Sequence, residues 1–171
     1  MEFKDKLPEF SNNLEFSREK TSSIALTSSS NVVYVGDGFN YLEYGENFTG
    51  KMRVLARILS GDYLHTQIRA KGGAYGAGIS INQNGTIATY SYRDPNLDET
   101  FKVYDEIFEY LDNLNLTQEE LTNYIISTMN QFYPPITPAQ YASLALSRHF
   151  TNLSEDEFEE LKKEAIETTP E

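Results

Sequence analysis

The sequence predicts an α+β domain, an antiparallel sheet with helices packed on one face. Two observations come from the first half of the chain, where short alternating segments indicate strands and Asn84-Gly85 indicates a tight hairpin. A third comes from the second half, where helix-start signals recur. The order strand, helix, hairpin and then four helices favours a single sheet covered on one side.

The composition fits one domain. The 171 residues have 39% hydrophobic content, which supplies one core and leaves little room for a second domain. We predict a linker or N-terminal arm over residues 1–22, which are polar and unpatterned, and a single α+β domain over residues 23–171. We also expect truncation at the C-terminus, because Thr169-Pro170-Glu171 is typical of a helix start.

Charge and cysteine usage exclude several functions. The formal net charge of -12 argues against nucleic acid as a partner, and an acidic field either favours basic ligands or simply keeps the domain soluble. No apolar run approaches the roughly 20 residues that span a bilayer, so we expect no membrane partner. The absence of cysteine excludes thiolate zinc sites and fits a cytoplasmic location of the bacterial type.

The first half of the chain contains the predicted strands and one long helix. Strand-like alternation covers residues 24–26 and 33–35, and Gly36-Asp37-Gly38 ends this segment. From Thr49, apolar residues recur at helical spacing and the pattern extends to Ile68 before glycines break it. After that break, residues 77–81 and 86–92 form the two strands of the hairpin.

The second half is predicted to be helical. After Arg93-Asp94-Pro95 closes the hairpin strand, a helical stripe consists of Phe101, Tyr104, Phe108 and Leu111. Capping boxes begin at Thr117 and Ser154, and Thr137-Pro138 supplies a cap followed by proline. The apolar positions of these last helices are Leu121, Tyr124, Ile125, Thr128, Tyr141, Leu144, Ala145, Phe158, Leu161 and Ala165.

The segment at residues 68–78 is the strongest candidate for function. It places Arg69 and Tyr75 on either side of the glycine pair Gly72-Gly73. Glycine tolerates positive φ and close backbone approach, a guanidinium carries five donors, and a phenol can donate to a polarised oxygen. Such a loop can hold a peptide carbonyl or carboxylate. From the residues alone, a simple helix terminator explains Gly72 and Gly73 as well as ligand binding does, and an exposed loop pair is the favoured interpretation of Arg69 and Tyr75.

Other chemistries find little support in the residues. His65 and His149 do not belong to a His-Glu-x-x-His or His-x-x-Glu-His motif, so we expect no zinc site within the chain. The glycines lack the spacing and the Gly-Lys-Ser/Thr of a phosphate-binding loop, which argues against nucleotide binding. Tyr90 and Tyr92 are interpreted as core or cavity residues of a strand rather than as chemical groups.

Two motifs carry a resemblance to a known family. The first is Arg69-Ala70-Lys71-Gly72-Gly73-Ala74-Tyr75-Gly76, and the second, after the hairpin, is Ser91-Tyr92-Arg93-Asp94-Pro95-Asn96. Together they resemble the C-terminal, non-zinc half of the insulinase/pitrilysin-type zinc metallopeptidases, in the presequence protease branch. The likeness is specific over residues 49–97 and only architectural across the later helices.

The resemblance implies a division of labour. Members of the family resemble a clamshell of four α+β domains in two halves, with the zinc, its ligands and the general base on the first half. The second half contributes an Arg and a Tyr that reach the substrate across the enclosed chamber. Carried over by motif, these are Arg69 and Tyr75, which support catalysis and, with Gly72 and Gly73, bind substrate. No cofactor is then expected in this chain, and zinc is expected in the N-terminal half of the parent protein.

The resemblance therefore predicts the substrate-binding domain of a zinc-dependent endopeptidase that degrades unstructured peptides. Its partners would be a peptide substrate and the N-terminal zinc-bearing half, and the isolated chain would be inactive. The alternative is a non-catalytic peptide-binding or scaffolding subunit without such a partner half. A His-x-x-Glu-His upstream in the same reading frame would favour the first.

Overall fold

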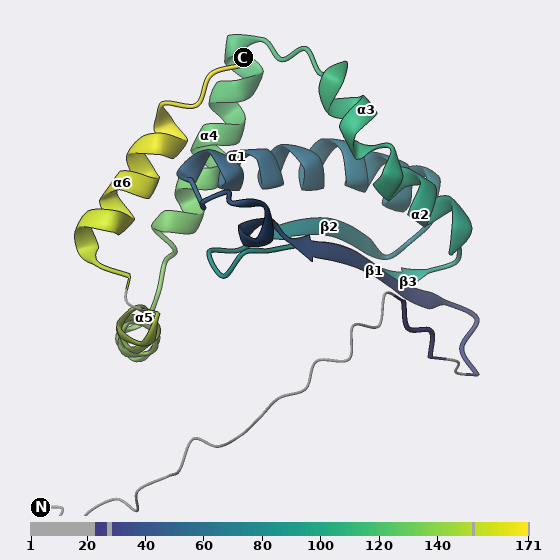
Figure 1. Ribbon diagram of the computed structural model, residues 1–171, viewed down its shortest axis with the longest axis horizontal. Coiled ribbons are helices and arrows are strands. Elements are labelled where there is room, and N and C mark those ends of the chain that lie inside the picture. Colours follow the sequence, from purple (N-terminus) through teal and green to yellow (C-terminus); the bar gives the residue numbers. More distant parts are fainter. Residues whose placement is uncertain (1–22, 27–28, 152, 171) are drawn as a thin grey trace, which may run out of the picture.

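A computed structural model describes residues 23–26, 29–151 and 153–170 (Figure 1), so the predicted N-terminal arm lies outside the described residues. The elements in chain order are β1 (Val33–Asn40), the short 3-10 helix η1 (Tyr41–Tyr44), α1 (Gly50–Ile58), η2 (Leu59–Lys71), β2 (Gly76–Ile81), β3 (Thr86–Asp94), α2 (Asp98–Asp105), α3 (Ile107–Asp112), α4 (Gln118–Phe132), α5 (Pro138–Phe150) and α6 (Glu155–Ile166).

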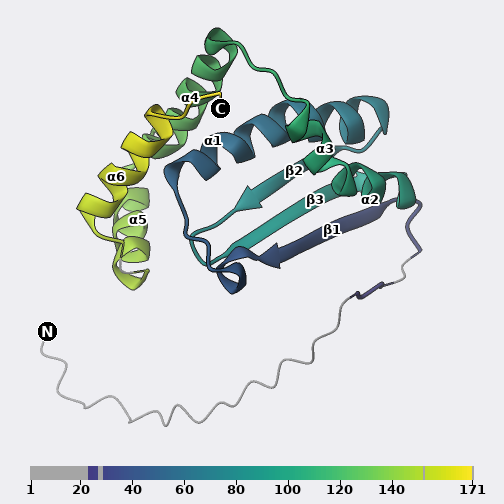
Figure 2. The same ribbon diagram turned by 45° about the horizontal axis from the view of Figure 1, so that its top comes forward.

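The sheet has three antiparallel strands in the order β1-β3-β2. The helix formed by α1 and η2, together with α2 and α3, lies over one face of this sheet, whereas α4 and α6 pack beside the start of α1 (Figures 1 and 2). The helix α5 lies apart from α1, at the turn of the chain between α4 and α6. No helix of the described residues covers the other face. The α+β prediction, with helices on one face of an antiparallel sheet, is confirmed.

The first strand differs from its prediction at both ends. Residues 24–26 are not in a strand, and Leu26 is 92% exposed. Gly36, Asp37 and Gly38 do not end β1 but pair with β3 in register. A Cβ at Gly38 would overlap the Ile87 carbonyl oxygen, so the missing side chain permits the close approach of the two strands.

One long helix, predicted from Thr49 onward, extends through α1 and η2. Its second part is wound with wide, π-type turns, as in the bond from the Gly72 N–H to the Gln67 carbonyl at 3.0 Å. The apolar face of η2 packs on the sheet and on α2 and α3. This first core cluster consists of Val35, Leu59, Tyr63, Leu64, Ile68, Ala74, Tyr104 and Ile107.

A second core cluster joins α1 to the last helices. It consists of Val54, Ile58, Leu121, Phe132, Phe158, Leu161 and Ala165. The first turn of α1 lies so close to α6 that a Cβ at Gly50 would overlap the Leu161 carbonyl oxygen. The Gly50 N–H donates to Glu164 Oε2 at 2.6 Å, so a residue 114 positions away caps the helix in place of the Thr49 side chain.

The three predicted helix starts are confirmed, each with a capping box, at Thr117, Thr137 and Ser154. The predicted stripe at residues 101–111 is partly wrong, because the helix breaks at Glu106 into α2 and α3. After the break Ile107 is buried and Phe108 is exposed, and Phe101, which lies in α2 before the break, is exposed as well.

The helix α5 has no buried residue. Its predicted core position Tyr141 is 64% exposed, because no other described element covers this helix. Its apolar spacing therefore predicted the helix correctly and its burial wrongly. None of the helices in the described ranges is both long and apolar enough to cross a membrane.

The contact between α1 and α6 leads to a prediction for two glycines of the same long helix. Gly50→Ala should lower the free energy of unfolding by about 1–3 kcal/mol, because its Cβ would collide with backbone. Gly61→Ala is the matched control, since the nearest atom to its Cβ is Tyr124 Cε1 at 3.9 Å. It should raise the free energy of unfolding by about 0.5–1 kcal/mol. Urea denaturation measures both; equal effects would contradict the packing.

The capping box of α6 predicts a pH effect. Glu157 accepts hydrogen bonds from the backbone N–H and the hydroxyl of Ser154, and these bonds lower the pKa of Glu157 from its ordinary value of 4.5. They therefore stabilise the fold above that pH, and this contribution is lost as the pH falls through the lowered value. In urea denaturation between about pH 6 and pH 3, both Glu157→Gln and Ser154→Ala should lose less stability than the unsubstituted chain. Equal losses would contradict this account.

Candidate functional site

An open groove lies at the end of the sheet where η2 turns into β2, at the right in Figure 1. The start of β1 and the end of β3 meet it at the same place, since Val33 pairs with Asp94 and Gly76 with Tyr92. The groove has a volume of about 770 Å³. It is lined by Val32, His65, Arg69, Ala70, Gly73, Ala74, Tyr75 and Arg93.

The groove contains both members of the predicted pair. Arg69 lies on the last turn of η2 and is exposed, and Tyr75 follows the glycine bend and is 67% exposed. Neither side chain has a hydrogen bond or ion pair with the other described residues. Both groups are therefore free to bind a ligand in one shared groove.

The two glycines terminate the helix. Gly73 has φ +82, in the left-handed region, and a Cβ at Gly72 would lie 2.6 Å from the Ile68 carbonyl oxygen. The N–H groups of Gly73 and Ala74 donate to the carbonyls of Arg69 and Ile68, both at 3.1 Å. The positive φ of Gly73 and the close carbonyl at Gly72 require glycine at both positions, so the helix end alone explains the pair. Direct ligand binding by Gly72 and Gly73 stays a prediction.

Aromatic side chains cover the open face of the sheet next to the groove. Tyr92 packs edge-to-face against Tyr34 at 5.1 Å and against Tyr75 at 5.5 Å between ring centroids. The strand period puts Tyr90 and Tyr92 on the face opposite to the buried Thr89 and Ser91. Neither tyrosine is therefore a core residue, and the tyrosine at position 92 supports the ring of Tyr75.

Sequence reasoning missed two residues of the groove, His65 and Arg93. His65 precedes Arg69 by four residues, so the helical period already places both on one face. Arg93 has φ +49 and is the one non-glycine residue in the described part of the chain with positive φ. That backbone conformation, which turns the chain out of the strand, has no signature in the sequence.

A buried carboxylate supports this end of the sheet. Asp94 Oδ1 accepts from the Asn96 N–H at 2.9 Å, and Asp94 Oδ2 accepts from Thr100 Oγ1 at 2.7 Å. Asn96 Nδ2 in turn donates to the Gly72 carbonyl at 2.6 Å. The end of β3 is thereby tied to the start of α2 and to the glycine bend that positions Arg69 and Tyr75.

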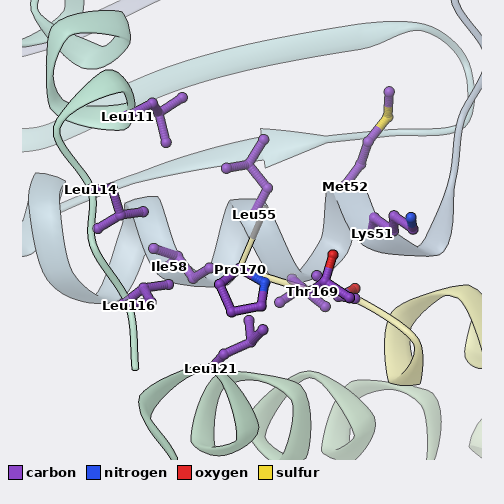
Figure 3. A pocket seen from close by; sticks show the side chains of 12 residues that line it. Lys51, Met52, Leu55, Ile58, Leu111, Leu114, Leu116, Leu121, Thr169 and Pro170 are labelled. Atoms are coloured by element: carbon purple, nitrogen blue, oxygen red, sulfur yellow. The ribbon is translucent and has the colours of Figure 1, made fainter. Parts of the chain in front are cut away.

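Two other features offer no comparable chemistry. Among the described residues, no group of three or more His, Cys, Asp or Glu side chains could hold a metal ion, so the residues present do not fit a zinc centre. A cavity of about 330 Å³ lies between α1, α4 and the C-terminal segment (Figure 3). Its walls are largely aliphatic, including Leu55, Ile58, Leu116, Leu121 and Pro170.

Comparison with known proteins gives the family. A family model described as the PreP C-terminal domain matches residues 24–171. The chain belongs to this family. The predicted resemblance to the presequence protease branch is confirmed. The matched range includes every residue that lines the groove.

Curated relatives of this PreP C-terminal domain are several times longer. Protein HypA of Clostridium perfringens is 35% identical over 162 residues, which cover 91% of this chain and 16% of the relative. Presequence protease 1, chloroplastic/mitochondrial, of Arabidopsis thaliana is 30% identical over 146 residues, covering 85% and 14%. The mitochondrial presequence protease of Drosophila melanogaster is 35% identical over 120 residues, covering 69% and 11%. The chain spans about a sixth or less of the length of these relatives.

The buried carboxylate leads to a testable expectation. Thr100→Val keeps the side-chain shape but removes a hydrogen bond from a buried charge, and should lower the free energy of unfolding by about 1–3 kcal/mol. It should also shift the amide NMR signals of Gly72 and Gly73. Thr122→Val is the matched control, because its exposed hydroxyl bonds only to the Gln118 carbonyl of its own helix. Its effect should stay within about 0.5 kcal/mol; a similar loss in both variants would contradict the role of Asp94.

Proposed function

We propose that this chain is the substrate-binding domain of a zinc-dependent endopeptidase that degrades unstructured peptides. In this proposal Arg69 and Tyr75 face the substrate across a cleft from the zinc, which is bound by an N-terminal half of the same polypeptide. The observation that carries the proposal is that Arg69 and Tyr75 line one open groove and that neither side chain forms a hydrogen bond or ion pair within the described residues. Membership of the PreP C-terminal domain family supports it.

The two side chains suit different tasks in peptide cleavage. The phenol of Tyr75 can donate a hydrogen bond to the scissile carbonyl oxygen, where negative charge develops in the transition state. The guanidinium of Arg69 can hold a neighbouring backbone carbonyl through its planar fork of N–H donors. The zinc of the other half would supply the activated water. This chain would thus contribute binding and alignment.

The open face of the sheet suits an extended, unstructured chain. Tyr34 and Tyr92 present exposed aromatic surface beside the groove, and Tyr92 packs against the ring of Tyr75. Rings of this kind contact any peptide without selecting one side chain. A cytoplasmic location of the bacterial type also belongs to the proposal and is supported by the relative in Clostridium perfringens, although other relatives are named as mitochondrial.

Tyr75→Phe tests the catalytic part of the proposal. In the enzyme that joins this domain to its zinc-bearing half, loss of one donor to the developing oxyanion should lower kcat by about 10²–10³. The free energy of unfolding should change by less than about 0.5 kcal/mol, because the ring is exposed. Tyr141→Phe, at an exposed tyrosine of α5, is the matched control and should leave kcat unchanged.

Two further measurements separate this function from the alternatives. The isolated chain should bind an unstructured peptide, with NMR shift changes at residues 69–76, and should leave the peptide intact. Cleavage by the isolated chain that is lost on chelation would overturn the proposal. A scaffolding subunit would bind the peptide equally well but would have no reading frame upstream that encodes a zinc-bearing half.

A further inference from the structure

The groove is a cationic site on an acidic domain. Its charged side chains are Arg69 and Arg93, with His65 beside them, and none of the described residues that line it is an aspartate or glutamate. The whole chain has a formal net charge of -12. Two guanidinium groups at one groove therefore stand out against the surrounding charge, and they point to a ligand that is locally negative.

Arg93 is held in this groove at a conformational cost. Its φ of +49 lies in the left-handed region, which costs a residue with a Cβ about 1–2 kcal/mol. Such a conformation persists where the surrounding structure over-determines it. Here the next residue is the buried Asp94, which is fixed by Asn96 and Thr100. The same hydrogen bonds that hold the end of β3 therefore direct the chain at Arg93.

The guanidinium of Arg93 has no partner within the described part of the chain. The neighbouring carboxylate of Asp94 is fully buried and directed to Asn96 and Thr100, and it forms no ion pair with Arg93. Arg69 is unpaired as well. The two guanidinium groups are thus exposed, unneutralised and directed to one groove.

We propose that Arg93 binds a carboxylate of the bound peptide, with Arg69 adding its charge to the same site. This inference rests on the proposed function, and it adds a substrate class: peptides with a free carboxylate at the groove. The planar fork of a guanidinium matches a carboxylate with two parallel hydrogen bonds, whereas a neutral carbonyl accepts them less strongly. The carboxylate is either the C-terminus of the peptide or an Asp or Glu side chain.

The experiment compares three unstructured peptides of otherwise identical neutral sequence, titrated into the 171-residue chain by fluorescence anisotropy. One has a free C-terminal carboxylate, the second a C-terminal amide, and the third a C-terminal amide with one internal Asp. The amidated neutral peptide should bind about tenfold more weakly than whichever carboxylate peptide the groove selects. Tight binding of the first peptide alone identifies the C-terminus, and tight binding of the third alone identifies a side chain.

Variants at position 93 assign the preference to this side chain. Arg93→Asn removes the charge with a residue that tolerates positive φ, and Arg93→Gly relieves the strained backbone altogether. Both should abolish the roughly tenfold preference for the carboxylate peptide over the amidated neutral peptide. Arg93→Lys should retain part of the preference. Lys102→Gln removes one exposed positive charge from α2 and is the matched control, which should retain all of it.

The outcomes distinguish this inference from the proposed function. If none of the peptides binds, the proposed function fails and this inference fails with it. If all three peptides bind equally to the unsubstituted chain, with shifts at residues 69–76, the carboxylate site is wrong and the proposed function stands. The inference is also overturned if Lys102→Gln weakens the preference as much as Arg93→Asn does, because the effect would then arise from net charge alone.

Discussion

The geometry of the groove depends on one buried carboxylate. Asp94 is fully buried at the end of β3, and a buried charge is tolerated only when its oxygens accept hydrogen bonds. Asn96 and Thr100 donate these bonds, and Asn96 also donates to the Gly72 carbonyl. The end of β3 and the start of α2 therefore meet the glycine bend, which lies 24 positions before Asn96 in the chain. The exposed side chains of the groove extend from this fixed point.

The long helix transmits the packing of the last helices to the groove. At its start, Gly50 lies against α6, and at its end, Arg69 extends from η2 into the groove. The second core cluster fixes the start of this helix, and the first fixes η2 on the sheet. Because a packed helix moves as a rigid element, the orientation of Arg69 depends on contacts at both ends of the molecule. The helices beyond the sheet thus belong to the support of the site.

Much of the fold could be predicted from local signals. The hairpin at Asn84-Gly85 and the three capping boxes each depend on residues close together in sequence, and the structure contains all of them. The predictions that failed depended on distant partners. Pairing with β3 extends β1 through Gly36 and Gly38, and the lack of a covering element leaves Tyr141 exposed. Local patterns define elements, but tertiary contacts decide where an element ends and which face is buried.

The same distinction applies to the candidate site. Arg69 and Tyr75 could be found because they flank a glycine pair, and the helical period could have added His65. Arg93 could not be found in this way, since hydrogen bonds around its neighbour Asp94 decide its backbone conformation.

The net negative charge of the domain favours one orientation of a peptide bound in the groove. For a peptide that binds as proposed, the acidic surface attracts basic segments over distances up to the Debye length, about 8–10 Å at physiological salt. The two guanidinium groups act only at contact, where desolvation strengthens their bonds to a carboxylate. A basic peptide with a single carboxylate can make both interactions in only one orientation. Its carboxylate then lies in the groove and its basic residues lie over the acidic surface. The opposite orientation would place like charges together at both positions.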